Sequence, residues 1–325
     1  MESPVSLALP PRVRFPGLSS AAFEHPADRA ALEALRRTPG LDRLLRWLSD
    51  MGAERYVRLM FTADSIRVSP RQCPRLYNDL REACAILDMP EPEFYLSQFY
   101  APNAFAFGMQ RHTLVMTTSL VDLLSDTERL EVIGHELGHI KAEHMLYRTM
   151  AIMLAEVMSG ALRDIATLPG KLLSVTLLTA LYAWFRKSEL TADRAGLLTV
   201  QDSEICVSGL LKLAGGSQKL VDDLNPAEFV KQADLYDDME EDLLSFLYKL
   251  DMIRLQTHPF PAIRAREISD WANTEQYHRL LRGDYPRTDT EAGKRLCTAC
   301  GTSVANVTFQ FCPECGNPLD PVARN

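Results

Sequence analysis

Apolar residues recur at helical spacing over most of this chain, and runs typical of strands are confined to one central region. The spacing i, i+3, i+4, i+7 indicates an amphipathic helix and is seen at 76–87 and at Leu41, Leu44, Leu45 and Leu48. We therefore expect a helical lead-in over residues 26–90. Residues 1–25 are rich in proline and lack this periodicity, which predicts an extended N-terminal arm.

The central region between Glu93 and Val121 predicts a small β-sheet. Three short runs, at 94–96, 104–108 and 113–118, contain the aromatic and β-branched residues that favour strands. Residues 197–282 return to helical character. Together these elements predict an α+β fold that is mainly helical.

A long helix is predicted from Thr127 to Met150. Ser125 and Glu128 resemble the capping box that often begins a helix, and the apolar residues that follow give the helix a broad buried side. The helix therefore belongs to the predicted core.

Two apolar stretches follow this helix, at 150–162 and 172–185, and Pro169-Gly170 is a turn signal between them. The second stretch is shorter than the roughly 20 residues that span a bilayer, and Glu156 interrupts the first. We expect a packed helical hairpin. Contact of residues 150–185 with a membrane is the alternative.

Composition narrows the class of protein. The 325 residues are 46% hydrophobic and 24% charged, which is ordinary for a globular chain, and the net charge of -8 argues against a general nucleic-acid binder. The N-terminus lacks the pattern of a secretory signal, and three scattered cysteines suit a reducing compartment. We expect a cytoplasmic protein, with peripheral attachment to a membrane as the alternative.

The string His135-Glu136-Leu137-Gly138-His139 carries the clearest chemistry in the chain. His135 and His139 lie four positions apart, so one helical face presents both imidazoles to a single metal ion. Glu136 projects about a quarter-turn away, which suits a general base beside an activated water. The alternative is a core helix whose histidines hydrogen-bond to their neighbours.

A catalytic zinc usually takes three protein ligands. His144 lies about 140° from His139 on a continuing helix, so it cannot face the same metal unless the helix breaks. Glu189 and Asp193 share one helical face, which would suit a ligand and a carboxylate that supports a ligating histidine. They could equally be surface charges. Besides His144 and Glu189, the candidates considered for the third ligand are Glu143 and Glu156.

Four segments, spread over roughly 95–270, resemble one protein superfamily. They are HELGH at 135–139, SELTADRAG at 188–196, PNAFAFG at 102–108, and Thr257-His258-Pro259 with Arg264. In this order they are similar to the gluzincin metallopeptidases of the HtpX and CAAX-prenyl-protease superfamily, which includes Ste24-like, Oma-like and BepA-like members. The short hydrophobic stretches depart from its membrane-bound members.

The resemblance implies a zincin catalytic domain over 26–282, with its core at 91–270, and a role for each matching residue. His135, His139 and Glu189 would bind zinc, and Glu136 would be the base. Asp193 and Arg264 would support the ligands, and His258 would stabilise the oxyanion. Asn103 would belong to the catalytic residues, and the strand that follows it would pair with an extended substrate. That strand consists of Ala104, Phe105, Ala106, Phe107 and Gly108.

The C-terminal cysteines predict a second, structural metal site. They form two CxxCG units, at Cys297 and Cys300 and at Cys312 and Cys315. Four thiolates close a tetrahedral site, so we expect a zinc ribbon over 295–325 behind a linker at 283–294. A disulfide or redox pair is the alternative. Few basic residues accompany the ribbon, which favours a protein partner over nucleic acid.

The sequence therefore predicts a zinc-dependent endopeptidase that acts on protein or peptide substrates and holds one catalytic and one structural zinc ion. The alternative is a non-catalytic or latent protease scaffold whose ribbon mediates protein interactions.

Overall fold

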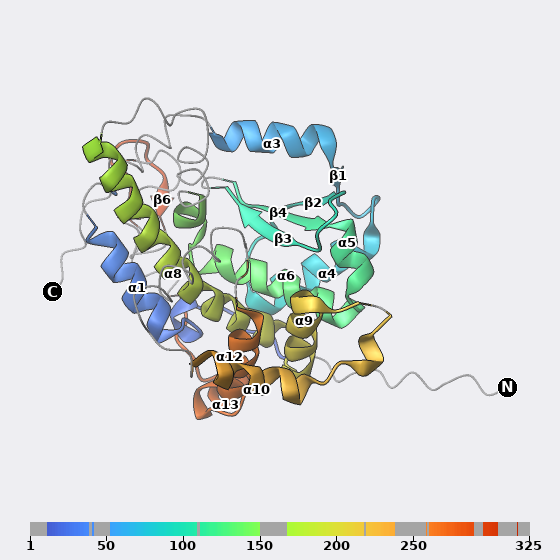
Figure 1. Cartoon of the computed structure of the whole chain (residues 1–325). Coiled ribbons are helices and arrows are strands. Elements are labelled where there is room, and N and C mark those ends of the chain that lie inside the picture. Colours follow the sequence, from blue (N-terminus) through green and yellow to red (C-terminus); the bar gives the residue numbers. More distant parts are fainter. Residues whose placement is uncertain are drawn as a thin grey trace.

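A small mixed sheet lies against a larger group of helices (Figure 1). The computed structural model describes residues 12–38, 41, 53–108, 111–149, 168–217, 219–237, 258, 260–288, 295–304 and 317. Within them the sheet has the strand order β1-β2-β4-β3, with β2 and β4 parallel and the other pairs antiparallel. The strands are β1 Ile66–Arg67, β2 Glu93–Ser97, β3 Ala104–Phe107 and β4 Thr113–Thr117. The predicted sheet is therefore confirmed.

Helices make up most of the remaining structure, so the mainly helical prediction is also confirmed. The larger ones are α1 Pro26–Arg36, α3 Ala53–Asp64, α4 Pro74–Leu87, α5 Thr118–Leu123, α6 Asp126–Lys141, α8 Leu168–Val200, α9 Ser203–Gly215, α10 Pro226–Asp237, α12 Pro261–Ala272 and α13 Glu275–Leu281. Two short 3-10 turns, Ser20–Ala22 and Val221–Asp223, and a hairpin of β5 Arg295–Leu296 and β6 Ser303–Val304 complete the described elements.

Helix α6 begins as predicted but ends earlier. The Ser125 hydroxyl and the Glu128 carboxylate form the expected capping box. The predicted single helix from Thr127 to Met150 is wrong, because α6 stops at Lys141 and a new helical segment begins only at residue 145. The connecting turn places Glu143 in the left-handed region, at φ 62. Residues 142–144 contain no glycine or proline, so no local stop signal announced this break.

Helix α8 joins segments that the sequence had separated. It includes the apolar stretch 172–185 and continues through Glu189 and Asp193 without a break. Pro169 and Gly170, interpreted as a turn, lie in the first turn of this helix, where proline is tolerated. The other stretch, 150–162, lies outside the described residues. Among those that are described, no helix is long and apolar enough to cross a membrane.

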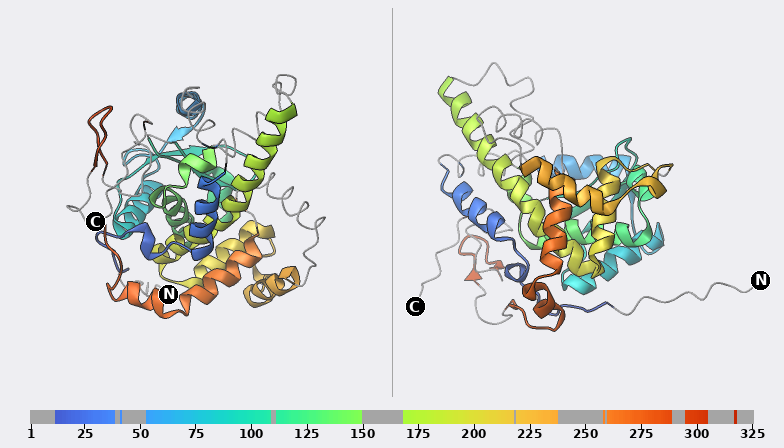
Figure 2. Two further views of the ribbon diagram at one scale, coloured as in Figure 1. Left: turned by 90° about the vertical axis from the view of Figure 1, so that its left-hand side faces the viewer. Right: turned by 60° about the horizontal axis from the view of Figure 1, so that its bottom comes forward.

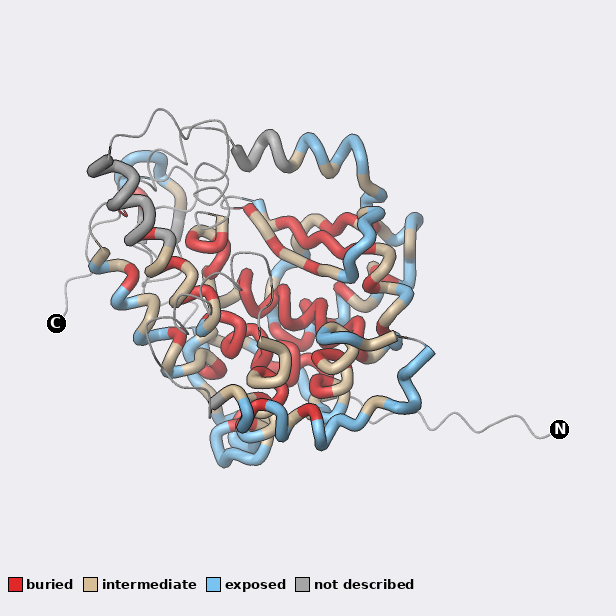
Figure 3. The backbone as a smooth tube through the Cα atoms, viewed as in Figure 1, coloured by how far each residue is buried: buried red, intermediate tan, exposed pale blue. Residues whose placement is uncertain are grey.

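The core is built around the contact between α6 and α8. Most of α6 from Glu128 to Ile140 is buried (Figure 3). At Gly138 the two helices come so close that a Cβ there would lie 2.5 Å from the Cβ of Ala195 and 3.2 Å from the Cα of Ala192. The close contact therefore leaves no room for a side chain at Gly138.

The N-terminal segment is not a free arm over the residues that the structure describes. Phe15, Leu18 and Phe23 are buried in the main core, which corrects the prediction for residues 12–25. The first part of the expected linker pairs with this segment, because Thr288 N donates to Gly17 O at 2.7 Å. Residues 17–18 and 287–288, far apart in the sequence, thus lie side by side (Figure 2).

We predict that Gly138→Ala destabilises the protein by about 1–3 kcal/mol, the usual cost of overpacking a core. Steric conflict with α8 outweighs the gain of up to about 1 kcal/mol that alanine brings to a helix. Urea unfolding monitored by circular dichroism measures the change.

Gly215→Ala is the matched control, because no described atom lies within 4 Å of a Cβ at that position in α9. It should be neutral or slightly stabilising. Equal stability of the two variants would contradict the close contact between α6 and α8.

Candidate active site

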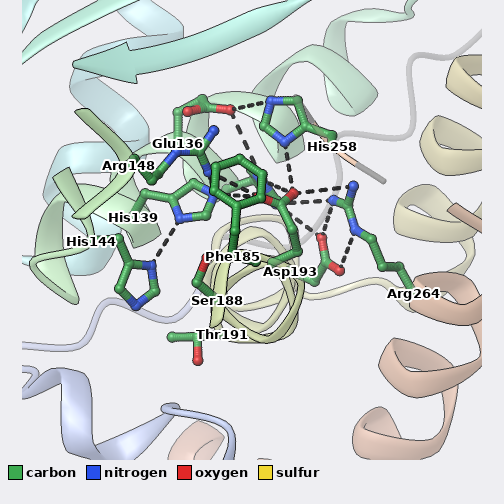
Figure 4. A network of polar contacts seen from close by, with 12 residues as sticks. Glu136, His139, His144, Arg148, Phe185, Ser188, Thr191, Asp193, His258 and Arg264 are labelled. Atoms are coloured by element: carbon green, nitrogen blue, oxygen red, sulfur yellow. Dashed lines mark hydrogen bonds and ion pairs between the residues drawn. The ribbon is translucent and has the colours of Figure 1, made fainter. Parts of the chain in front are cut away.

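Two adjacent helices bring the predicted ligands together (Figure 4). His135 and His139 come from α6, and Glu189 comes from α8. The Nε2 atom of His135 lies 3.4 Å from Glu189 Oε2, and Nε2 of His139 lies 3.2 Å from Glu189 Oε1. All three residues are buried. Two imidazoles and one carboxylate thus converge on a common point.

His135 is supported on its outer side by a carboxylate. Its Nδ1 atom lies 2.9 Å from Asp193 Oδ1, and Arg264 binds both oxygens of that carboxylate. Burial alone would lower the pKa of His135, but the contacts with Asp193 and Glu189 outweigh it and raise that pKa to about 10. A metal on Nε2 would therefore displace a proton. The structure brings together both residues that were predicted to support the ligands.

His139 has different neighbours. Its Nδ1 atom lies 2.9 Å from Nδ1 of His144, and its Nε2 accepts from Nη1 of Arg148 at 2.5 Å. Arg148 also donates to Glu189 Oε1 at 2.9 Å, and its guanidinium lies over the ring of Phe185. Burial, followed by the Arg148 charge, holds the pKa of His139 well below its usual value. This histidine is therefore neutral and presents a lone pair to the centre of the site.

The turn after α6 explains where His144 goes. It was excluded as a ligand because a continuing helix would carry it away from the metal. The helix does break, but the break returns His144 to the outer nitrogen of His139, away from Glu189. Arg148 was missed altogether. The available signal was an arginine four residues after His144 in an otherwise apolar segment.

Glu136 is placed as a buried carboxylate beside this centre. Neither of its oxygens has a hydrogen-bond partner among the described residues, although His258 Nε2 lies 3.3 Å from Oε1. A carboxylate accepts hydrogen bonds only, and leaving it buried without a donor is costly. Its position suits a group that receives a proton from a small molecule such as water.

His258 connects the centre to the edge of the sheet. Its Nδ1 lies 2.7 Å from Glu189 Oε2, and its Nε2 lies 2.8 Å from the carbonyl oxygen of Ala104 in β3. Strand β3 is an edge strand of the sheet and pairs only with β4 among the described strands. Asn103, just before it, is anchored through its backbone to Thr117. The structure thus places the expected substrate strand next to the expected ligands.

The donor set fits a metal ion of the zinc type. The potential ligand atoms of His135, His139, Glu189 and His258 all lie within 4.8 Å of one another. The His135 Nε2 atom is buried and has no hydrogen bond within the described part of the chain. Imidazole nitrogens with one carboxylate are usual for catalytic zinc. Arg148 and a metal ion would compete for the same lone pair on His139, so binding would require this guanidinium to move.

The other metal-site candidates are only partly described. Glu143 is not in this cluster, and Glu156 lies outside the described residues. At the C-terminus, Cys297 and Cys300 lie in the β5–β6 hairpin. There Gly301, at φ 73, forms a tight turn back to the Cys297 carbonyl. Cys312 and Cys315 also lie outside the described part, so the four-thiolate site stays a prediction.

The sequence of this chain matches a known protein family and several known proteins. Residues 70–272 match Peptidase family M48. The chain is 36% identical over 283 residues to "Plastoglobule-localized metallopeptidase 48, chloroplastic" of Arabidopsis thaliana, a match covering 86% of this chain and 80% of that protein. It is 29% identical over 197 residues to "Protease HtpX homolog 2" of Methanosarcina mazei, covering 52% and 65% respectively. No solved structure gives a significant match. The chain belongs to peptidase family M48, as an HtpX-like metallopeptidase.

Proposed function

We propose that this protein is a zinc-dependent endopeptidase, with His135, His139 and Glu189 as zinc ligands and Glu136 as the general base. One observation carries the proposal. The buried carboxylate of Glu136, which makes no hydrogen bond within the described residues, lies beside the cluster of His135, His139, Glu189 and His258. Metal-assisted hydrolysis needs this combination of a metal site and a base next to it.

Zinc would supply Lewis acidity, which lowers the pKa of a water to about 7 and polarises a peptide carbonyl. The residues do the rest. Glu136 takes the proton of the attacking water and delivers it to the leaving amine. Asp193 and Arg264 hold His135 in one orientation, and the buried setting strengthens every charge interaction at the site.

We propose that the substrate binds as an extended strand along β3, from Ala104 to Phe107. Edge addition recognises backbone groups, which suits an enzyme that accepts varied protein substrates. His258 supports this geometry because it contacts both the Ala104 carbonyl and Glu189. A substrate strand would take over the Ala104 contact, which frees His258 Nε2 to donate to the oxyanion of the reacting carbonyl.

The C-terminal ribbon is proposed to hold a structural zinc through Cys297, Cys300, Cys312 and Cys315 and to bind a protein partner. The Cys297 amide donates to the Thr302 carbonyl, and the Gly301 amide donates to the Cys297 carbonyl. These two bonds form a short turn that suits a pair of thiolates on one metal ion. The cytoplasm stays our predicted location, although the Arabidopsis relative is described as plastoglobule-localized and chloroplastic.

We predict that Glu136→Gln lowers kcat on casein or a quenched peptide by about 10²–10⁴-fold, the usual contribution of a general base. Zinc content should be unchanged, because Glu136 is not a ligand. The exposed Glu228→Gln is the control and should keep full activity. Full activity of Glu136→Gln would exclude this mechanism.

Zinc should stabilise the folded protein through Glu189. At a free zinc concentration 100 times Kd, binding adds about 2.7 kcal/mol to the free energy of unfolding. Glu189→Gln should lose most of this increment, measured for each variant against its own zinc-free form by thermal unfolding. Glu228→Gln should retain it. An equal increment in all three proteins would place the metal elsewhere.

Metal counting tests the ribbon. The purified chain should contain about two zinc ions, and joint replacement of Cys297 and Cys300 by serine should reduce this to about one, with peptidase activity retained. Plasma mass spectrometry measures the ratio. An unchanged ratio would rule out these thiolates as ligands.

A further inference from the structure

A chain of buried hydrogen bonds connects His139 to Asp28 in α1, outside residues 70–272 that match the peptidase family. His139 Nδ1 lies 2.9 Å from His144 Nδ1, and His144 Nε2 lies 3.0 Å from Asp28 Oδ2. Each of the three residues is at most 1% exposed. Water therefore does not compete for these contacts.

At Asp28, the far end of this series of hydrogen bonds, the donors and acceptors are defined. Asp28 Oδ1 accepts from the indole of Trp184 at 2.9 Å, and an indole N–H can only donate. Asp28 Oδ2 accepts from the Thr191 hydroxyl at 2.6 Å, and that hydroxyl accepts in turn from the His25 amide. Burial would raise the pKa of Asp28, but contacts with His144, Thr191 and Trp184 lower it. The carboxylate is thus an acceptor throughout, so His144 Nε2 donates to it.

This direction determines the tautomer of each histidine. With its proton on Nε2, a neutral His144 offers a lone pair on Nδ1, which must accept from Nδ1–H of His139. His139 then has its lone pair on Nε2. The Arg148 guanidinium, which has no acceptor, gives the same result independently, because it donates to His139 Nε2. A doubly protonated His144 would force His139 Nε2–H against the Arg148 N–H.

A separate apolar cluster packs around these hydrogen bonds. The buried part of this cluster comes from α1, from the segment after the turn and from α8. Its members are Leu35, Leu41, Tyr147, Leu177, Leu181, Trp184 and Phe185. The ring of His144 also meets the Trp184 ring edge-on at 5.4 Å. Hydrogen bonds in such a dry setting are stronger than in water, and each partner is costly to remove.

We propose that His144 and Asp28 are positioning residues that hold His139 in the Nδ1–H tautomer, with Nε2 directed at the metal. Helix α1 is then part of the metal site. This inference rests on the proposed function only in taking His139 as a zinc ligand. The two histidine ligands differ accordingly: His135 contacts the Asp193 carboxylate directly, whereas His139 reaches Asp28 through a neutral imidazole.

The first test measures zinc affinity of the full chain by competition with a chromophoric chelator. His144→Phe keeps an aromatic ring but removes both nitrogens, so zinc should bind about 10–100-fold more weakly, as is usual when a ligand loses its supporting partner. Asp193→Asn should weaken zinc binding by a similar factor through His135.

Asp79→Asn is the matched control. It removes the negative charge of the carboxylate whose Oδ2 accepts from Arg129 at 2.9 and 2.7 Å. Arg129 is also on α6 but away from the metal site, so stability should fall while zinc affinity stays the same. Unchanged zinc affinity in His144→Phe, with the expected loss in Asp193→Asn, would overturn the inference.

A second measurement covers the case in which His144→Phe does not fold. Nitrogen-15 spectra of the zinc-loaded, histidine-labelled wild-type chain should show His144 as the neutral Nε2–H tautomer and His139 as the Nδ1–H tautomer. A proton on Nδ1 of His144 would overturn the inference. Neither readout needs peptide cleavage, so failure of the peptidase assay is distinguishable from failure here.

Discussion

The site depends on the close contact of α6 with α8. The absence of a side chain at Gly138 allows Ala195 to approach, and this brings a carboxylate on one helix within reach of two imidazoles on the other. A wider helix separation would move Glu189 away from both histidines together. The helical pair thus acts as one rigid support, because close-packed interiors resist small displacements.

The charged groups buried around this contact stabilise one another. Burial would raise the pKa of the Glu189 carboxyl, but His258 and Arg264 hold that pKa well below its usual value, and Arg148 also contacts this carboxylate. Removing any one partner would leave a buried charge without compensation, which is more costly than the pair is favourable. The buried charges are therefore weak evidence for a gain in stability.

Much of the local structure was predictable because its signals are local. The three strands follow from β-branched and aromatic runs, and the start of α6 follows from a capping box four residues long. The end of α6 was not predictable. Residues 142–144 contain no glycine or proline, and the turn that they form brings His144 to His139 and to Asp28, which is distant in sequence.

The sequence by itself determined that two histidines four apart, with a glutamate between them, share one helical face, because helix geometry relates neighbours at fixed angles. Glu189 and His258 were expected only from the resemblance to a known family, and only the tertiary structure decided that Arg148 and Asp28 join them. All four residues enter through packing between helices, strand edges and turns. Such contacts depend on how the whole core closes, and no short-range pattern encodes that closure.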